Sequence, residues 1–213
     1  MSGIHFRAGF LLIQLLSVAS LNAQPSFQQT ADGVEVMLPG NNPDSIRSVR
    51  LTVIRDNIIR VEASNLRKPA AAASLMVLPG LKKQHNWQSQ RSGDSLVIST
   101  SLLRAAISLI SGRVCFTDQA GNTIISEKGR TFIPVTLEQE QQAYTIRQNF
   151  KSVNDEAIYG LGQHQQGIIN YKNQNLLLEQ INTEVSIPFL VSDRNYGILW
   201  DNNSLSWYGD GRA

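Results

Sequence analysis

Residues 159–167 read Tyr-Gly-Leu-Gly-Gln-His-Gln-Gln-Gly, and residues 187–202 read Ile-Pro-Phe-Leu-Val-Ser-Asp-Arg-Asn-Tyr-Gly-Ile-Leu-Trp-Asp-Asn. Three glycines within nine residues predict a backbone that turns tightly or passes close to another surface, because glycine adopts positive φ angles at little cost. Gln163, His164 and Gln165 place hydrogen-bonding side chains beside these glycines. These two stretches are the most informative part of the chain.

The rest of the chain is dominated by short segments in which apolar and polar residues alternate. Residues 48–54 alternate in this way, Asp56-Asn57 predicts a polar turn, and residues 58–63 predict the second arm of a hairpin. Ala120-Gly121-Asn122 predicts another hairpin. Many short strands at close spacing favour an all-β, antiparallel β-sandwich over a parallel sheet with helices. The predicted strands cover residues 33–38, 48–54, 58–63, 94–100, 103–110, 113–118, 123–126, 144–150, 183–191 and 196–201.

Two segments compete as helices. Residues 69–78 contain four alanines, which favour a helix by propensity, but the segment lacks a capping box and ends at Pro79-Gly80. We interpret it as a connection that runs into a short strand. Residues 137–143 are interpreted as a polar hairpin loop.

The first 23 residues are typical of an export signal. A short basic start is followed by the apolar residues 8–21 and by Ala23, a small residue suited to cleavage. The apolar run is shorter than the roughly 20 residues that a membrane-spanning helix needs, so no membrane span is predicted. We expect residues 24–213 to form one domain that is periplasmic or secreted.

Charge and cysteine content exclude several functions. Without the export signal, 18 basic and 17 acidic side chains remain, and no Lys/Arg cluster stands out, so nucleic acid is not an expected partner. The single cysteine, Cys115, excludes an internal disulfide and is predicted to be a buried core residue. His85 and His164 are far apart in sequence, and the glycine spacing does not fit a phosphate-binding loop, so no metal or cofactor is expected.

The motifs of the second half resemble the N-terminal, galactose mutarotase-like β-sandwich of glycoside hydrolase family 31, in particular its α-xylosidase branch. The family places an acidic residue before a Tyr-Gly-Leu-Gly turn, as Glu156 precedes residues 159–162 here. The further matches, in family order, are Gln163-His164-Gln165, Gly167, Asn182-Thr183, Pro188-Phe189, Tyr196-Gly197-Ile198, Trp200 and Asn202.

The resemblance implies a parent enzyme that hydrolyses α-glycosidic bonds with retention, using two aspartates on a (β/α)₈ barrel. Such a barrel needs roughly 250 residues, and no segment here resembles the sequence around the family nucleophile. We therefore expect the chain to hold no catalytic residue and to be silent without the barrel, its expected partner domain. The family sandwich takes further strands, so the sheet is expected to be incomplete at its C-terminal end, with an unpaired edge.

In the family, the loop between the glycine turn and the Pro-Phe strand reaches over the barrel mouth. The resemblance implies that residues 163–183 form this loop, and His164, Gln180, Asn182 and Thr183 are the candidate substrate-binding residues. The expected ligand is an α-linked oligosaccharide, such as one derived from xyloglucan. Four aromatic residues are candidate sugar-stacking platforms, with a core position as the alternative for the first: Trp200, Trp207, Tyr208 and Tyr171.

Simpler readings and rival functions stay open at this point. His164 is also explained as a loop histidine bonded to neighbouring backbone, and Glu156 as an anchor that accepts backbone N–H bonds from the glycine turn. The rival functions are an independent carbohydrate-binding module, a mutarotase-like isomerase that uses Glu156 and His164, and a fragment without activity of its own.

Overall fold

The computed structural model describes residues 26–41, 46–67, 74–76, 86–138, 142–151 and 153–209. Within these ranges the chain forms antiparallel strands and turns and no α-helix, which confirms the predicted all-β class. No helix there is long and apolar enough to cross a membrane. The strands are β1 (Ser26–Gln29), β2 (Gly33–Met37), β3 (Ser48–Arg55), β4 (Ile58–Ser64), β5 (Gln88–Ser92), β6 (Ser95–Ser99), β7 (Arg104–Ser108), β8 (Val114–Thr117), β9 (Thr123–Thr136), β10 (Gln142–Phe150), β11 (Ile158–Gln163), β12 (Leu176–Leu178), β13 (Val185–Ser192), β14 (Tyr196–Leu199) and β15 (Ser206–Tyr208).

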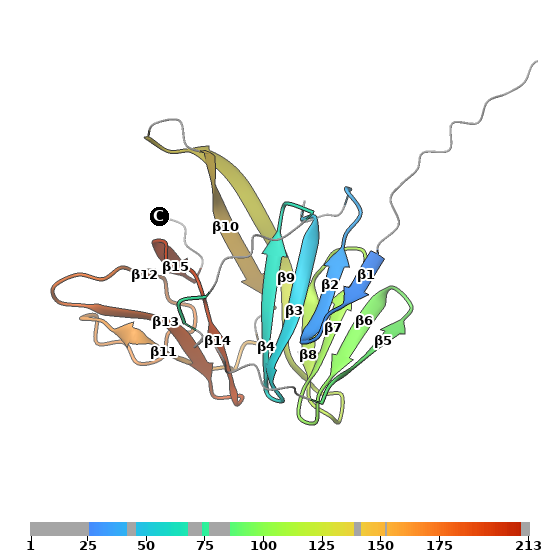
Figure 1. The fold of residues 1–213 in the computed structure, drawn as a ribbon. Coiled ribbons are helices and arrows are strands. Elements are labelled where there is room, and N and C mark those ends of the chain that lie inside the picture. The colour runs from blue at the N-terminus through green and yellow to red at the C-terminus, as the bar shows by residue number, and fades with distance from the viewer. Residues whose placement is uncertain are drawn as a thin grey trace, which may run out of the picture.

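Two sheets make up the sandwich. The four-stranded sheet has the order β1-β2-β3-β4, and the six-stranded sheet has the order β10-β9-β8-β7-β6-β5 (Figure 1). Strands that follow one another in sequence are paired, so each sheet is a chain of hairpins. The β9–β10 hairpin is the longest and projects past the ends of its neighbours (Figure 1).

The main core lies between these two sheets. Alternate side chains of β2 and β3 point inward and meet alternate side chains of β6, β7 and β8, as the period of two along a strand requires. Each fully buried aliphatic side chain contributes about 1.5–3 kcal/mol relative to exposure. The fully buried members include Val34, Val36, Val49, Leu51, Leu96, Ile98, Ala105, Ile107 and Val114.

A buried ion pair closes one edge of this core. Arg130 and Glu127, both on β9, contact each other with side chains that are 3% and 4% exposed. Arg130 Nη1 also donates to the Gly112 carbonyl at 2.9 Å, and the Val114 amide donates to Glu127 Oε2 at 2.7 Å. Since each charge also bonds to backbone of the β7–β8 connection or of β8, the pair fixes that region against β9.

The remaining five strands form a smaller lobe beside the sandwich, drawn in orange and red (Figure 1). It holds a three-stranded sheet of order β11-β13-β14 and a two-stranded sheet of β12 and β15. A second core fills it, made of the buried residues Ile158, Leu161, Tyr171 and Leu176. The motifs of the second half of the sequence therefore build a packed unit of their own within the predicted domain.

The glycine-rich motif is a strand with a bulge, so the close approach predicted for residues 159–162 is confirmed and the alternative, a tight turn, is wrong. Its pairing with β13 shifts between Gly160 and Gly162, and Gly160, Leu161 and Gly162 have φ angles of 97°, 63° and 104°. A Cβ atom at Gly162 would lie 1.9 Å from the Val185 carbonyl oxygen. Glycine is needed here for both backbone angle and space.

The structure also tests the predictions for Cys115, for the end of β9 and for the loop between β9 and β10. Cys115 is half-buried and not a core residue, because its neighbour Val114 takes the inward position on β8. Strand β9 runs ten residues past the predicted end at 126. Residues 137–138 lie between β9 and β10, as the loop prediction required, but Gln142 and Ala143 of the predicted loop already belong to β10. The predicted export signal, His85 and residues 69–73 and 77–80 fall outside the described residues.

Candidate functional site

Residues 180–184 form a tight turn that connects β12 to β13. Ile181 and Glu184 pair in an isolated antiparallel bridge, so Asn182 and Thr183 form the tip. Both tip residues are exposed. The turn therefore presents one amide and one hydroxyl side chain to the outside, groups that can both donate to and accept from a sugar hydroxyl.

The Gln180 side chain braces this turn. Its Nε2 donates to the Glu184 carbonyl at 3.2 Å, and its Oε1 accepts from the Ser186 amide at 3.2 Å. Both ends of the side-chain amide are thus bonded to the opposite side of the turn. This geometry makes Gln180 a support of the tip.

His164 lies under the same turn with a side chain that is 0% exposed. Its Nδ1 is 3.1 Å from Glu184 Oε2, and its Nε2 is 2.9 Å from the Leu161 carbonyl oxygen. The Tyr171 ring packs edge-on against the imidazole at 6.2 Å between centroids. The contact with neighbouring backbone is the one that the simpler interpretation of a loop histidine expected.

The Glu184 carboxylate collects hydrogen bonds from the segment that follows β11. Besides His164, the Gln166 side chain donates to its Oε1 at 3.2 Å, and the Gln165 amide lies 3.5 Å from the same oxygen. The hydrogen bond from His164 is the largest cause of a lowered pKa for Glu184. A lowered pKa means that the carboxylate form is the stabilised one.

The structure therefore brings the four predicted substrate-binding residues together but gives them two different environments. Asn182 and Thr183 point outward at the tip, whereas Gln180 and His164 are bonded within the chain beneath it. Sequence reasoning missed Glu184, the residue to which His164 and Gln166 bind. No spacing signal marks it, because the two partners of the His164–Glu184 pair are 20 positions apart.

Glu156 occupies a separate buried cluster. Its Oε1 accepts from Ser192 Oγ at 2.6 Å and from the Tyr196 hydroxyl at 2.5 Å, and Lys172 Nζ lies 3.7 Å from its Oε2. The expectation that Glu156 accepts backbone N–H bonds from the glycine motif was wrong. Side-chain hydroxyls of β13 and β14 supply its bonds instead, because the bulge of β11 bonds to β13.

The pKa values of this cluster are tied to the buried carboxylate. Burial by itself raises the pKa of Glu156, but the hydrogen bonds from Ser192 and Tyr196 and the charge of Lys172 outweigh burial and lower it. Burial and the negative charge of Glu156 raise the pKa of Tyr208 to about 12. Burial, together with the hydrogen bond to Glu156, also raises the pKa of Tyr196. For Glu156, Tyr196 and Tyr208 alike, the pKa is shifted away from neutral pH.

Glu156 and His164 do not form one acid–base pair. Glu156 binds Ser192 at the last residue of β13, and His164 binds Glu184 just before its first residue. Eight residues of extended chain separate these two partners by roughly 27 Å. The arrangement therefore offers no shared site for the mutarotase-like chemistry that needs both groups.

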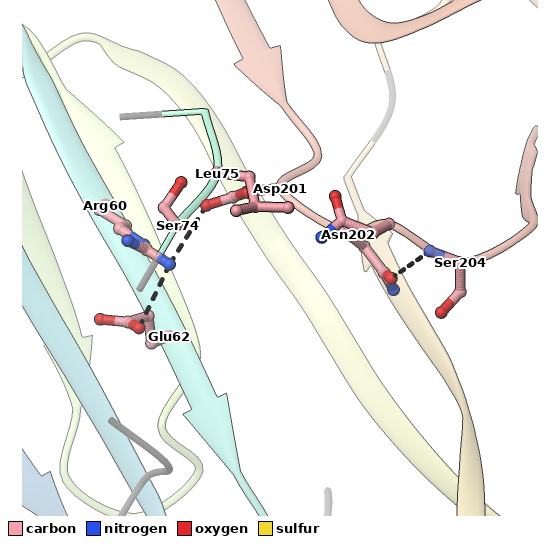
Figure 2. A pocket seen from close by; sticks show the side chains of 8 residues that line it. Arg60, Glu62, Ser74, Leu75, Asp201, Asn202 and Ser204 are labelled. Atoms are coloured by element: carbon pink, nitrogen blue, oxygen red, sulfur yellow. Dashed lines mark hydrogen bonds and ion pairs between the residues drawn. The ribbon is translucent and has the colours of Figure 1, made fainter. Parts of the chain in front are cut away.

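A polar groove of about 360 Å³ lies where the smaller lobe meets the sandwich, lined by Arg60, Glu62, Ser74, Leu75, Asp201, Asn202, Asn203 and Ser204. Figure 2 shows the Arg60 guanidinium between two carboxylates, 3.1 Å from Asp201 Oδ2 and 3.4 Å from Glu62 Oε1. Sequence reasoning did not find this groove, since its lining comes from three separate parts of the chain: β4, residues 74–75 and the segment after β14.

The two carboxylates of the groove are not arranged for retaining hydrolysis. That chemistry needs one free carboxylate as nucleophile and one carboxyl able to carry a proton. Here Glu62 and Asp201 contact the same guanidinium, which holds a fixed positive charge between them. The contact between Arg60 and Asp201 instead ties the smaller lobe to the sandwich.

One face of the β11-β13-β14 sheet is apolar and exposed. Alternate side chains of β13 point outward, while the intervening ones face the smaller lobe. Tyr159 is paired with Val191, and Leu199 with Phe189, so neighbouring strands extend the same face. The face comprises Tyr159, Val185, Ile187, Phe189, Val191 and Leu199, each between 39% and 50% exposed. We call these six residues the apolar face.

The aromatic candidates for sugar stacking are divided. Tyr171 is buried in the core of the smaller lobe, and Tyr208 packs edge-on against it with 6.5 Å between ring centroids. Trp200 is partly buried, and Trp207 is 51% exposed. Of the four, Trp207 has the most accessible ring.

Comparison with known proteins gives a consistent set of relatives. Residues 48–208 match the family model described as the glycosyl hydrolase 31 N-terminal galactose mutarotase-like domain. The α-xylosidase of Saccharolobus solfataricus is 34% identical over 168 residues, which cover 74% of this chain and 22% of that protein. A family 31 glucosidase of Pseudescherichia vulneris, itself uncharacterized, is 24% identical over 179 residues, covering 74% of this chain and 33% of that protein.

Solved structures agree in fold. The GH31 α-xylosidase of Xanthomonas citri superposes with a TM-score of 0.80 at 41% identity, over 87% of this chain and 20% of that one. A GH31 α-xylosidase from a soil metagenome, solved with xylose, gives a TM-score of 0.65 at 24% identity, over 85% of this chain and 29% of that one. The chain thus spans between a fifth and a third of the length of these relatives.

Proposed function

The chain belongs to the N-terminal galactose mutarotase-like domain family of glycoside hydrolase family 31, and from this premise we propose that it is the accessory β-sandwich of a retaining α-glycosidase of the α-xylosidase type. The identities of 41% and 34% to two α-xylosidases support this branch. The proposed substrate is an α-linked, xylose-containing oligosaccharide, such as a fragment of xyloglucan.

The apolar face supports packing against a catalytic barrel domain. An antiparallel sheet with one solvated face normally carries polar residues on that face, and a contiguous exposed apolar patch marks an interaction site. Here six apolar side chains occupy one side of three paired strands. We propose that the catalytic domain of the longer enzyme covers this face and holds the smaller lobe beside its substrate opening.

The 180–184 turn is the proposed contribution to the substrate rim. Its tip offers Asn182 and Thr183, and its base is fixed by Gln180 and by the buried His164–Glu184 pair. A braced turn presents its polar groups in one geometry, which lowers the entropy cost of binding a flexible sugar. In this proposal Asn182 and Thr183 contact the sugar, while Gln180 and His164 hold them in place.

Domain exchange tests the proposal. The equivalent domain of the Xanthomonas citri α-xylosidase is replaced by residues 26–209 of this chain, and hydrolysis of an aryl α-xyloside is measured. We expect the chimera to turn over and the isolated chain to stay at background. Asn182→Ala with Thr183→Ala in the chimera should raise KM about tenfold, as expected for the loss of one or two sugar hydrogen bonds.

Two results would reject the proposal. Turnover by the isolated chain, well above background, would show that catalysis does not need a barrel. A chimera that folds and binds its domains but has no activity would show that this sandwich does not support an α-xylosidase. Calorimetry of the isolated chain with xyloglucan oligosaccharides separates the rival function, because an independent binding module binds sugar without a barrel.

We also propose that residues 1–23 direct export, so that the enzyme acts in the periplasm or outside the cell. The support is the basic start, the apolar run of residues 8–21 and the small Ala23. Secretion of the full-length chain followed by N-terminal sequencing tests this. A mature N-terminus at Gln24 is expected, and retention of Met1 on cell-associated protein would reject it.

A further inference from the structure

His164 contacts two hydrogen-bond acceptors, one at each ring nitrogen. Its Nε2 lies 2.9 Å from the Leu161 carbonyl oxygen, and a carbonyl can only accept, so Nε2 carries a hydrogen. Its Nδ1 lies 3.1 Å from Glu184 Oε2, and an ionised carboxylate likewise only accepts. Both contacts are made at once only when the ring carries two hydrogens and is a positively charged imidazolium.

The alternative distribution places the proton on Glu184 and leaves the ring neutral. Two features of Glu184 oppose it. Gln166 Nε2 donates to its other oxygen at 3.2 Å, and the Gln165 amide lies 3.5 Å from that oxygen. Donors gathered on this oxygen stabilise the carboxylate without any contribution from His164.

The groups packed around the ring add no second charge to this pair. Tyr171, from the β11–β12 connection, meets the imidazole edge-on at 6.2 Å, and Tyr208 of β15 packs behind Tyr171. Burial and the charge of Glu156 keep the pKa of Tyr208 at about 12, so it is neutral wherever histidine titrates. Glu184 is the charged residue that the ring contacts.

The pair also occupies a particular place in the sheet. Gln163 and Val185 form the last paired positions of β11 and β13 at this end. His164 and Glu184 are the next residues on each strand, so their side chains continue the ladder one step beyond the backbone pairing. That step joins the glycine-rich strand to the base of the 180–184 turn.

We propose that His164, held as an imidazolium between Leu161 and Glu184, is the positioning residue that sets the 180–184 turn, and that the turn loosens when rising pH removes one of its two protons. The proton leaves Nδ1 for the solvent. The lone pair that remains faces the lone pairs of Glu184 Oε2, and attraction becomes repulsion. The consequence for sugar binding rests on the proposed function, whereas the role of His164 in setting the turn does not.

The test uses the full chain without sugar. Long-range ¹H–¹⁵N NMR of the His164 ring reports how many nitrogens carry a proton, and hydrogen-exchange protection factors of the Ile181 and Ser186 amides report the order of the turn. Both are followed between about pH 5 and pH 8, and we expect the number of protonated ring nitrogens to fall from two to one as the pH rises. Protection should fall about tenfold over the same interval, as for loss of a charge-assisted hydrogen bond.

Glu184→Gln is the matched variant. A glutamine amide can donate to an unprotonated Nδ1, so the variant keeps the contact with a neutral ring. We expect the turn of E184Q to stay protected at every pH in this range. Gln166→Ala is the control, since it removes a neutral bond to Glu184 and should leave the wild-type pH response in place.

The proposal is overturned if the wild-type ring carries one proton throughout the range, a measurement that needs no variant to fold. It is also overturned if E184Q loses protection with pH as the wild type does. In the chimera, KM for the xyloside should rise over the same interval in wild type and stay constant in E184Q. A turn that loosens without a change in KM would reject the sugar-contacting role of the turn. It would still support the role of His164 in setting the turn.

Discussion

Ser192 Oγ lies 2.6 Å from Glu156 Oε1, which joins the last residue of β13 to the segment that precedes β11. The Tyr196 hydroxyl binds the same oxygen at 2.5 Å and brings in the start of β14. The opposite end of β13 is held by the His164–Glu184 pair. One buried carboxylate and one buried imidazole thus fix the two ends of the strand that carries most of the apolar face.

Removing the Glu156 carboxylate should lower the free energy of unfolding of the smaller lobe. Glu156→Ala leaves the Ser192 and Tyr196 hydroxyls without their acceptor in a buried site, which costs about 2–3 kcal/mol of unfolding free energy. Urea denaturation measures the loss. Asp155→Ala is the neighbouring control, because Asp155 is 82% exposed and its pair with Arg194 should matter by less than about 0.5 kcal/mol. Equal effects of the two substitutions would contradict a role for the buried cluster.

The same carboxylate predicts how stability depends on acid. The pKa of Glu156 in the folded chain lies below its ordinary value of 4.5, so folding favours the ionised form. Its contribution is complete above the unfolded pKa and is lost as the pH falls through the folded one. Unfolding free energies measured from about pH 6 to pH 3 should therefore drop more steeply for the wild type than for Glu156→Gln. Parallel curves would show that Glu156 does not contribute.

The sequence predicted those strands whose side chains alternate between core and solvent. Strands β2, β3 and β4 show apolar alternation, and the structure places them close to the predicted bounds. Strand β5 was missed because Gln88–Ser92 is polar throughout, as an exposed edge strand allows. Strands β12 and β15 have three residues each, too few for a period to be visible.

The candidate site was predictable only in part, for a physical reason. The outward tip residues and the buried His164 were found because they fall inside a motif. Their partners were not found, because hydrogen bonds between Glu156 and Ser192 or His164 and Glu184 join residues 36 and 20 positions apart. The spacing of residue types within a short segment gives no signal for pairs that are so far apart in the sequence. For the glycine motif the predicted close approach is confirmed, but the sequence could not distinguish it from a tight turn, since the positive φ angles serve a bulge against the distant strand β13.

Gly162 tests the bulge directly. Gly162→Ala places a Cβ 1.9 Å from the Val185 carbonyl oxygen at a φ of 104°, so β11 and β13 must separate. We expect a loss of more than about 3 kcal/mol or failure to fold. Gly167→Ala is matched, because its φ is also positive, at 67°, but a Cβ there meets nothing within 4 Å. That control should cost only about 1 kcal/mol of backbone strain. Thermal denaturation of both variants shows whether the stability loss at Gly162 comes from the close approach to Val185 or from the backbone angle alone.

The apolar face should make the isolated chain associate with itself. Ile187 and Phe189 lie next to each other on the outward side of β13, 50% and 42% exposed, and belong to neither core. Replacing both with serine should reduce self-association, measured by sedimentation velocity, while changing the unfolding free energy by less than about 1 kcal/mol.

Leu102→Ser supplies the matched control for this variant. Leu102 is 59% exposed but lies in the turn between β6 and β7, away from the apolar face. Its substitution should leave the sedimentation profile unchanged. In the chimera, the double serine variant should also weaken the coupling between the two domains, seen as separate thermal transitions. If the two surface changes alter association equally, general hydrophobicity explains the behaviour and this face is not the docking surface.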